Sequence, residues 1–133
     1  MRDFADYESE TPGWFQLQRM TRPWFQDRIA SGDLIARDLT IWLWVASATD
    51  LKDGLARVSC NTLARDLSYG HWGHVSLALK RLQRAGAIQR VQQGVYMASP
   101  WLVRAGSPGK HLTWFRRWYE LETERQAHLP EAS

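Results

Sequence analysis

The spacing of apolar residues changes several times along the chain, and each change predicts a different element. Residues 14–19 (WFQLQR) alternate loosely between apolar and polar side chains, which predicts a short strand or an extended arm. A capping hydroxyl on Thr21 and a first-turn proline, Pro23, are typical of a helix start. We therefore expect a short helix that runs to about Ala30 and ends at Ser31 and Gly32.

The next helix is strongly apolar and is expected to open at Asp33 or Asp38. It contains Leu39, Ile41, Trp42, Leu43, Trp44, Val45 and Ala46. A helix that is hydrophobic nearly all round is a buried one, so this segment predicts the central helix of a small domain. The stretch 50–54 (DLKDG) ends it as a turn.

Two further helices and a hairpin follow. Arg57 and Val58 predict a short strand, and Ser59 caps a helix over residues 60–67. After a tight turn at 68–70, a second helix is expected over residues 71–85, with Gly86 as its C-terminal cap. Residues 88–91 and 95–97 then predict two strands joined at the turn 92–94. This order is that of a winged helix-turn-helix.

The last helix is expected to begin at Ser107 and Pro108 and to continue through Gln126. Its predicted apolar stripe is Leu112, Phe115, Trp118 or Tyr119, and Leu121 or Glu122. The aromatic residues exceed what one stripe needs, which leaves two interpretations open. They close the domain's own core, or they form a surface for a homodimer or a replication-protein partner.

The pattern as a whole predicts a mainly α fold with a small β-hairpin wing, a winged helix-turn-helix with an extra C-terminal helix. We expect a mobile N-terminal arm at 1–13, a winged-helix DNA-binding domain at 14–106, and a C-terminal helix at 107–127. With 133 residues and 44% hydrophobic residues, the chain suits one domain with a modest core.

Composition narrows the cellular setting. Cys60 is the single cysteine, so an intrachain disulfide is impossible and a reducing compartment is expected. The acidic, polar start of the chain is unlike a secretion signal, and the longest apolar stretch is too short to span a bilayer. These features predict a cytoplasmic protein associated with a nucleoid or plasmid and not with a membrane.

Charge is concentrated in the middle of the chain. Residues 57–117 hold ten Lys and Arg against one acid, a net charge of +9, whereas residues 1–56 and 118–133 each carry −3. A positive middle with negative ends is typical of a surface that faces phosphates. The alternative is a solvated basic face without a partner.

The second helix of the pair is the one expected to read DNA. Steps of 100° per residue place Val75, Ala78, Leu79 and Leu82 on one stripe that packs on the core. The opposite face holds Gly73, Leu77, Lys80, Arg81 and Arg84, with His74 and Ser76 on its flanks. That face has no acid, whereas a solvated face usually mixes both signs.

Each candidate residue has an expected role in the DNA complex. His71, Trp72, His74 and Ser76 reach base edges from the helix N-terminus, where Gly73 permits close approach and Leu77 contacts a thymine methyl. Lys80, Arg81 and Arg84 contact phosphates. Ser59, Asn61 and Thr62 lie near phosphates at the positive end of the first helix. Arg90, Gln92 and Gln93 form the wing tip. Trp72 in the core, and an ordinary polar turn at the hairpin tip, are the alternatives.

Metal binding and catalysis find little support in the sequence. His71, His74, His111 and Cys60 include an i,i+3 histidine pair, but no second cluster accompanies it. There is no phosphate-cradling loop, no paired catalytic carboxylates in the basic segment and no nucleophile beside a base. We expect no metal, no cofactor and no enzymatic activity.

Three stretches resemble a known family pattern. SCNTLARDL, VSLALKRLQRAGAIQR and QQGVYM, between residues 59 and 97, resemble the bacterial winged helix of the MarR and GntR kind. GVYMASPWLVRAG and DLTIWLWVASATDLKDG are similar to the wing-to-tail stretch and the central helix of plasmid replication proteins of the RepL type. The resemblance spans about residues 14–120.

The resemblance implies a function beyond DNA binding. It implies a sequence-specific double-stranded DNA-binding protein of a plasmid or mobile element, which initiates or controls replication at origin repeats. The alternative on the same scaffold is a transcriptional repressor that occludes a promoter.

Overall fold

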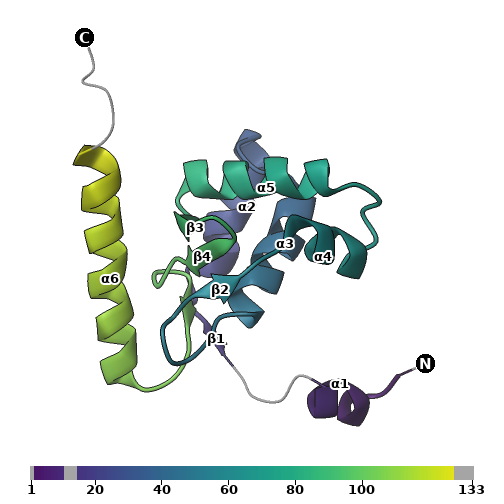
Figure 1. Cartoon of the computed structure of the whole chain (residues 1–133), viewed down its shortest axis with the longest axis horizontal. Coiled ribbons are helices and arrows are strands. Elements are labelled where there is room, and N and C mark those ends of the chain that lie inside the picture. Colours follow the sequence, from purple (N-terminus) through teal and green to yellow (C-terminus); the bar gives the residue numbers. More distant parts are fainter. Residues whose placement is uncertain (1, 11–14, 128–133) are drawn as a thin grey trace.

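The computed structural model describes residues 2–10 and 15–127, and there the chain is mainly helical with two small antiparallel sheets (Figure 1). This agrees with the expected class of a mainly α fold with a small β component. The elements in chain order are α1 (Phe4–Glu10), β1 (Gln16–Leu17), α2 (Thr21–Ser31), α3 (Ala36–Ser47), β2 (Ala56–Arg57), α4 (Cys60–Asp66), α5 (Trp72–Ala85), β3 (Ile88–Gln92), β4 (Val95–Ala98), β5 (Val103–Arg104) and α6 (Pro108–Ala127).

Helix α3 is the centre of the core, as its apolar sequence predicted. Ile41, Trp42 and Val45 are completely buried, and α3 contacts both α5 and β4. The indole of Trp42 donates a 3.0 Å hydrogen bond to the carbonyl of Ala87, which satisfies its one polar atom inside the core. Only the outer side of α3 meets solvent, at residues such as Leu43.

The start of α2 differs from the prediction that Thr21 is its cap. Met20 is the N-cap and supplies no side-chain hydrogen bond, whereas Thr21 is already helical and buried. Its hydroxyl donates instead to the carbonyl of Leu102, from a segment far along the chain. The end of α2 is as predicted, because Gly32 adopts a left-handed φ of 87° and its N–H bonds to the carbonyl of Ile29.

Neither aspartate expected to open α3 is its first residue. Ile35 is the N-cap, and Asp38 lies three positions later. The Asp38 carboxylate accepts a 3.0 Å hydrogen bond from the backbone N–H of Ile35, as a carboxylate in a first turn can. Asp38 therefore stabilises the helix start from within the helix, and its side chain is fully buried.

The main sheet has the strand order β2-β4-β3, with all pairs antiparallel. Strands β3 and β4 form the predicted hairpin, whose turn passes through Gly94 at a φ of 74°. The register shifts between Arg90 and Gln92, so one residue of β3 is unpaired near the tip. The predicted strand at Arg57 and Val58 is present as β2, over Ala56–Arg57.

A second, two-stranded sheet joins the segment before α2 to the segment before α6. The segment at residues 14–19 was expected to be a strand or an arm, and its middle forms β1. Strand β1 pairs with β5, with Gln16 opposite Arg104 and Leu17 opposite Val103. The backbone N–H of Gln18 extends the contact by donating to the carbonyl of Leu102.

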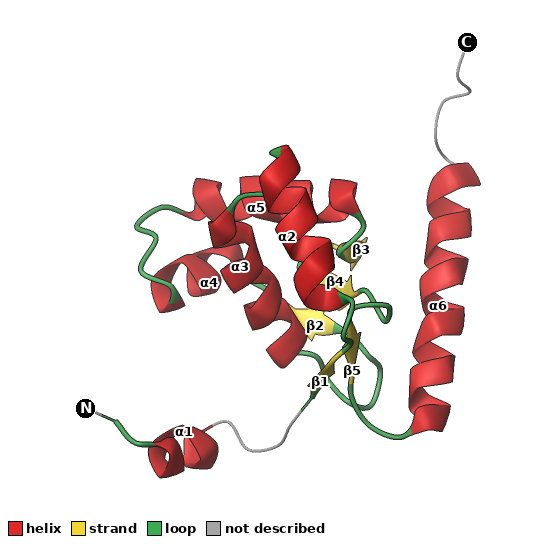
Figure 2. Cartoon of the chain, turned by 180° about the vertical axis from the view of Figure 1, so that it is seen from behind, coloured by secondary structure: helices red, strands yellow, loops and turns green. Residues whose placement is uncertain are grey.

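Helix α6 stands beside the sheet, separate from the other helices (Figures 1 and 2). Trp114, Trp118 and Leu121 are its buried side chains, and they form a second core cluster with Met97 and Ala105. The predicted stripe is thus right for Trp118 and Leu121 but wrong for Leu112, which is 66% exposed. Trp114 takes the inward position instead.

The surplus aromatic residues of α6 form an outward cluster. Phe115 packs edge-on against Trp101, with ring centroids 5.0 Å apart, and also contacts His111 and Tyr119. Trp101 and Tyr119 are each 47% exposed. Of the two interpretations left open, core closure therefore applies to the tryptophans of α6, while the other aromatics remain at the surface.

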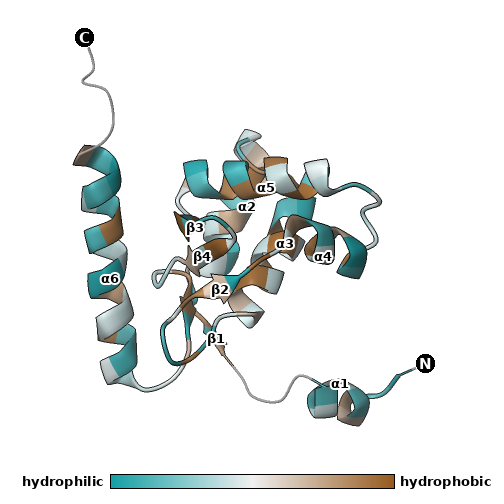
Figure 3. Ribbon diagram, in the orientation of Figure 1, coloured by the Kyte–Doolittle hydropathy of each residue, from teal (hydrophilic) through white to brown (hydrophobic). Residues whose placement is uncertain are grey.

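Helix α1 lies within the expected N-terminal arm and was not predicted. It buries none of its residues. Residues 11–13 of that arm, and Trp14, lie outside the described residues. Figure 3 shows hydrophobic colours on the strands and inner helices, while α1 and α6 are mostly hydrophilic. Within the described part of the chain, no helix combines the length and apolar character needed to cross a membrane.

Candidate nucleic-acid interface

Helix α5 has a buried face and an exposed face, divided as the helical spacing predicted. Val75, Ala78, Leu79 and Leu82 are at most 2% exposed and pack toward α3 and α4. On the other side Gly73 is partly buried, whereas His74, Leu77, Lys80 and Arg84 are exposed. The helix contains no acidic residue, so its outer face carries positive charge only.

His71 caps the N-terminus of α5 with its side chain. Its Nδ1 accepts a 2.9 Å hydrogen bond from the backbone N–H of Gly73. A neutral imidazole that accepts at Nδ1 carries its proton on Nε2, so the free side of the ring is a donor. A Cβ at position 73 would lie 2.8 Å from this Nδ1, and therefore only glycine leaves the cap undisturbed.

Trp72 lies at the surface, so the alternative that placed it in the core is wrong. Its side chain is 53% exposed, and its indole stacks on the imidazole of His71 with centroids 5.4 Å apart and planes 24° apart. The ring of His74 meets His71 edge-on at 6.3 Å. The first turn of α5 thus presents three adjacent aromatic rings to solvent.

Helix α4 approaches α5 at this end. The Ser59 hydroxyl accepts a 3.4 Å hydrogen bond from the backbone N–H of Thr62, which confirms Ser59 as the N-cap of α4. Asn61 and Thr62 are exposed in the first turn. A hollow of about 450 Å³ separates the two helices, and its lining includes Asn61, Arg65, His71 and Trp72.

The hairpin forms a second hollow with α5, also of about 450 Å³. Ser76 and Lys80 line it from α5, and Arg90 and Gln93 line it from the hairpin. None of the described residues that line it is acidic. Burial raises the pKa of the Tyr96 phenol, which lies in the same hollow, so this group stays neutral at physiological pH.

Arg81 does not belong to the exposed basic face, and here the sequence-based expectation is corrected. Its Nε and Nη2 each donate a 2.8 Å hydrogen bond to the Asp38 carboxylate. The pair raises the pKa of Arg81 further above its usual value. A buried carboxylate needs a cation, and Arg81 stands at the edge of the apolar stripe where it can reach α3. Arg81 links two helices.

Lys80 and Arg84 differ from Arg81 in this respect. Both side chains are exposed, and neither forms an ion pair with a described residue. Arg84 lines a polar hollow of about 630 Å³ with Arg28, at the end of α2. Asp33 lines the same hollow, but neither Lys80 nor Arg84 is paired with a described carboxylate, so both side chains are available to external anions.

Most of the predicted residues therefore lie on or beside the exposed side of α5. One group, at the first turn of α5 and in α4, comprises Asn61, Thr62, His71, Trp72, Gly73 and His74. A second, beside the hairpin, comprises Ser59, Ser76, Lys80, Arg90 and Gln93, with the exposed Gln92 next in the chain. Leu77 is 54% exposed between them.

Sequence reasoning missed two basic residues of this surface. Arg65 lines the hollow between α4 and α5, and Arg28 lines the one beside Arg84. Arg65 lies in the last turn of α4, and its position two residues after the buried Leu63 could have marked it as outward-facing. Arg28 carried no such signal, because its place depends on how α2 packs.

Metal chemistry is not indicated by this surface. Within the described part of the chain, no three His, Cys, Asp or Glu side chains gather closely enough to hold a metal ion. At the start of α5, His71 instead caps the helix, and the ring of His74 meets the ring of His71 edge-on. Comparison of the chain with protein-family models, with curated proteins and with solved structures finds no match.

Proposed function

We propose that this protein binds double-stranded DNA through α5 and the β3–β4 hairpin. The observation that carries the proposal is the outer face of α5. It has no acid, it presents Lys80 and Arg84 without ion-pair partners, and it lies between two hollows lined by arginines. A helix face of this charge attracts phosphates.

The order of elements supports a winged helix-turn-helix reading of the same surface. Helices α4 and α5 are joined by a short turn and followed by a hairpin whose tip lies beside α5. In this arrangement α5 enters the major groove, which is wide enough for one helix. The hairpin then lies along the backbone or the adjacent minor groove.

The roles of the residues follow from their places on α5. His71, Trp72, His74 and Ser76 lie in its first turns, where side chains reach base edges. Leu77 is placed to contact a thymine methyl. Lys80 and Arg84, with Arg65 and Arg90 on either side, contact phosphates and supply affinity that does not depend on sequence.

The biological role is proposed from the resemblance to RepL-type plasmid replication proteins. On that basis the protein binds repeated sites at the origin of a plasmid or mobile element in the cytoplasm, and initiates or controls replication without catalysing a reaction itself. The second candidate, a repressor, uses the same interface at a promoter. The two differ in the arrangement of their sites, which are direct repeats near an origin or a palindrome over a promoter.

The test is enrichment of a random duplex library on the purified protein, followed by binding measurements on the enriched sequence. We expect a defined motif and a tighter complex with it than with scrambled DNA. The double variant Lys80→Ala/Arg84→Ala is measured beside the wild-type protein. Both side chains are exposed, so the variant is expected to keep the fold and to bind DNA more weakly. Failure to enrich any motif, together with equal binding by the variant at low salt, would exclude the proposal. A footprint on the host element's own DNA then separates origin from promoter.

A further inference from the structure

An apolar groove runs between α2 and α3. Its volume is about 720 Å³. The completely buried Trp42 and the nearly buried Phe25 are among its lining residues. The other apolar side chains that line it, all more exposed, are Leu17, Ile29, Ala30, Leu39 and Leu43. A groove of this size and character suits an apolar occupant.

The charged residues of the groove are of one sign. Arg19 and Arg22 belong to its lining and are exposed, and none of the described lining residues is acidic. Among the described residues, the guanidinium of Arg22 donates to a neutral acceptor, the amide oxygen of Gln26, at 2.6 Å. The occupant that fits is therefore apolar on one side and acidic beside it.

Helix α1 has these properties. Phe4 is 93% exposed and Tyr7 is 51% exposed, and because they are three residues apart they share one face of the helix. The acidic residues of the segment are Asp3, Asp6, Glu8 and Glu10. The guanidinium of Arg2 lies over the ring of Tyr7, 4.3 Å from its centroid.

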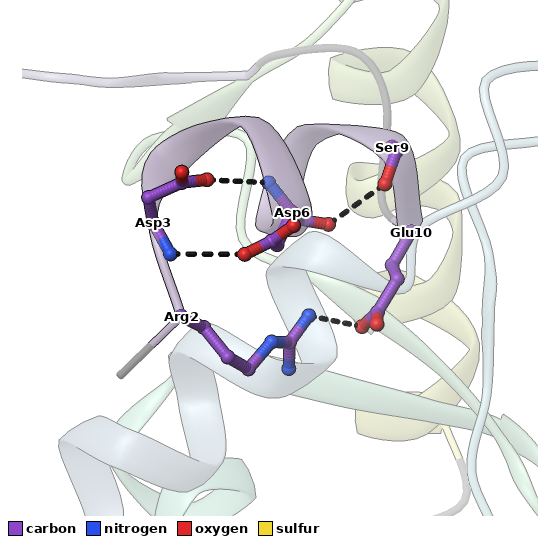
Figure 4. Close-up of polar contacts among 5 residues, drawn as sticks. All are labelled: Arg2, Asp3, Asp6, Ser9 and Glu10. Carbon is purple, nitrogen blue, oxygen red and sulfur yellow. Dashed lines mark hydrogen bonds and ion pairs between the residues drawn. The ribbon is translucent and has the colours of Figure 1, made fainter.

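Contacts within the segment favour the helical form of α1 (Figure 4). The backbone N–H of Asp3 donates to the Asp6 carboxylate at 3.1 Å, and the N–H of Asp6 donates to the Asp3 carboxylate at 3.2 Å. Arg2 and Glu10 form an ion pair across the helix. These contacts do not suffice alone, since an isolated helix shorter than about 12 residues is marginal in water. A helix of seven residues that buries none of them needs a surface to pack on.

We propose that the groove between α2 and α3 receives α1 of a second copy of this chain. In both views α1 lies away from α2 and α3 of its own chain (Figures 1 and 2). Two copies related by a two-fold axis can exchange α1 reciprocally, so that both grooves are filled by one closed contact. Phe4 and Tyr7 enter the apolar groove, and the α1 carboxylates face Arg19 and Arg22. This dimer goes beyond the proposed DNA-binding function.

The experiment is sedimentation velocity on the full chain over a range of concentrations. We expect a reversible monomer–dimer equilibrium. The variant Phe4→Ala/Tyr7→Ala raises the dimer dissociation constant at least about tenfold. Its fold is unaffected, because neither residue contributes to the core. Leu43→Glu and Arg19→Glu/Arg22→Glu have the same effect from the groove side. Leu112→Glu, an equally drastic change at an exposed leucine of α6, leaves the equilibrium unchanged.

Mixing two variants distinguishes exchange from docking within one chain. The Phe4→Ala/Tyr7→Ala chain keeps an intact groove, and the Leu43→Glu chain keeps an intact α1. Labelled separately and mixed, they form a heterodimer with one of the two contacts, although each alone is a monomer. Monomeric wild-type protein at every concentration, or a dimer that neither variant weakens, overturns the proposal. DNA binding measured on the same samples reports separately on α5.

Discussion

The guanidinium of Arg81 donates two 2.8 Å hydrogen bonds to the carboxylate of Asp38, and so connects α5 to the first turn of α3. Asp38 is completely buried, while the Arg81 side chain is 29% exposed. The same carboxylate accepts the backbone N–H of Ile35, so one buried side chain both starts α3 and holds α5 against it. The orientation of the proposed reading helix depends on this pair.

Removing the arginine of this pair is expected to destabilise the fold. Arg81→Met leaves a buried carboxylate without its cation, which lowers the free energy of unfolding by about 3 kcal/mol. The double variant Asp38→Asn/Arg81→Met removes both charges and keeps an acceptor for Ile35, so most of the loss is recovered. Urea unfolding of the single and double variants measures both effects.

A neighbouring arginine is the control for that prediction. Arg84→Met, at an exposed side chain, changes the free energy of unfolding by less than about 0.5 kcal/mol. Equal destabilisation by the two arginine substitutions would show that the Asp38 contact does not determine stability.

The exposed cations of α5 are expected to act on affinity without selecting a sequence. Lys80→Ala or Arg84→Ala weakens binding to every duplex and reduces the slope of log K against log salt by about 1. The measurement is fluorescence anisotropy over a series of salt concentrations. Unchanged binding at low salt would contradict a phosphate contact at the substituted position.

The first turns of α5 are expected to act on sequence preference. His74→Ala or Ser76→Ala costs about 1–3 kcal/mol on the enriched site and little on scrambled DNA. The ratio of the two dissociation constants is the measured quantity. An equal loss on both duplexes would show that these side chains do not read bases.

Gly54 is expected to be required for the position of α6. It has a φ of 71°, and a Cβ there would lie 2.7 Å from the indole nitrogen of Trp114. Gly54→Ala therefore adds a clash to backbone strain, and lowers the free energy of unfolding by about 2–4 kcal/mol. Gly32→Ala is the matched control, because Gly32 has a φ of 87° with no atom near a Cβ. It measures strain alone, at about 1 kcal/mol.

His111 is expected to make stability depend on pH. Burial lowers the pKa of its imidazole below the usual value, and the charge of Arg104 lowers it further. Its Nδ1 is also buried without a hydrogen-bond partner in the described residues. The unfolded chain takes up the proton first, so stability is complete above the unfolded pKa of about 6.5 and falls as pH drops through the folded pKa.

Unfolding midpoints measured between about pH 7.5 and pH 5 test this dependence. His111→Leu flattens the profile, because it removes the group that titrates. His74→Gln, at an exposed histidine, leaves the profile as it is. A profile that His111→Leu does not change would assign the dependence to another group.

Local signals predicted most of the elements. The Ser59 cap, the Gly32 and Gly86 stops and the period of apolar residues in α5 act within a few residues, so they can be read from the sequence. The same period placed Leu77, Lys80 and Arg84 on the outside correctly. Trp118 and Leu121 were also placed correctly on the buried side of α6.

Contacts between distant segments account for what the sequence did not reveal. Thr21 resembles a cap, but its hydroxyl bonds to a carbonyl 81 residues away. Arg81 was predicted to lie on the basic face of α5, yet its side chain bonds to Asp38 on another helix. Trp114 rather than Leu112 faces the sheet because the strands fix the rotation of α6. In each case the deciding partner is absent from the local sequence.

Strands β1 and β5 pair with each other although α2, α3, α4 and α5 lie between them in the sequence. Strand β1 can pair only after Val103 and Arg104 of β5 have been synthesised. The segment from α2 to β5 must therefore leave the ribosome before β1 and β5 can pair. Folding of this part of the chain is thus expected to finish late rather than from the N-terminus onward. A nascent chain halted before residue 102 leaves β1 unpaired and lacks the carbonyl of Leu102 that accepts the hydrogen bond of Thr21.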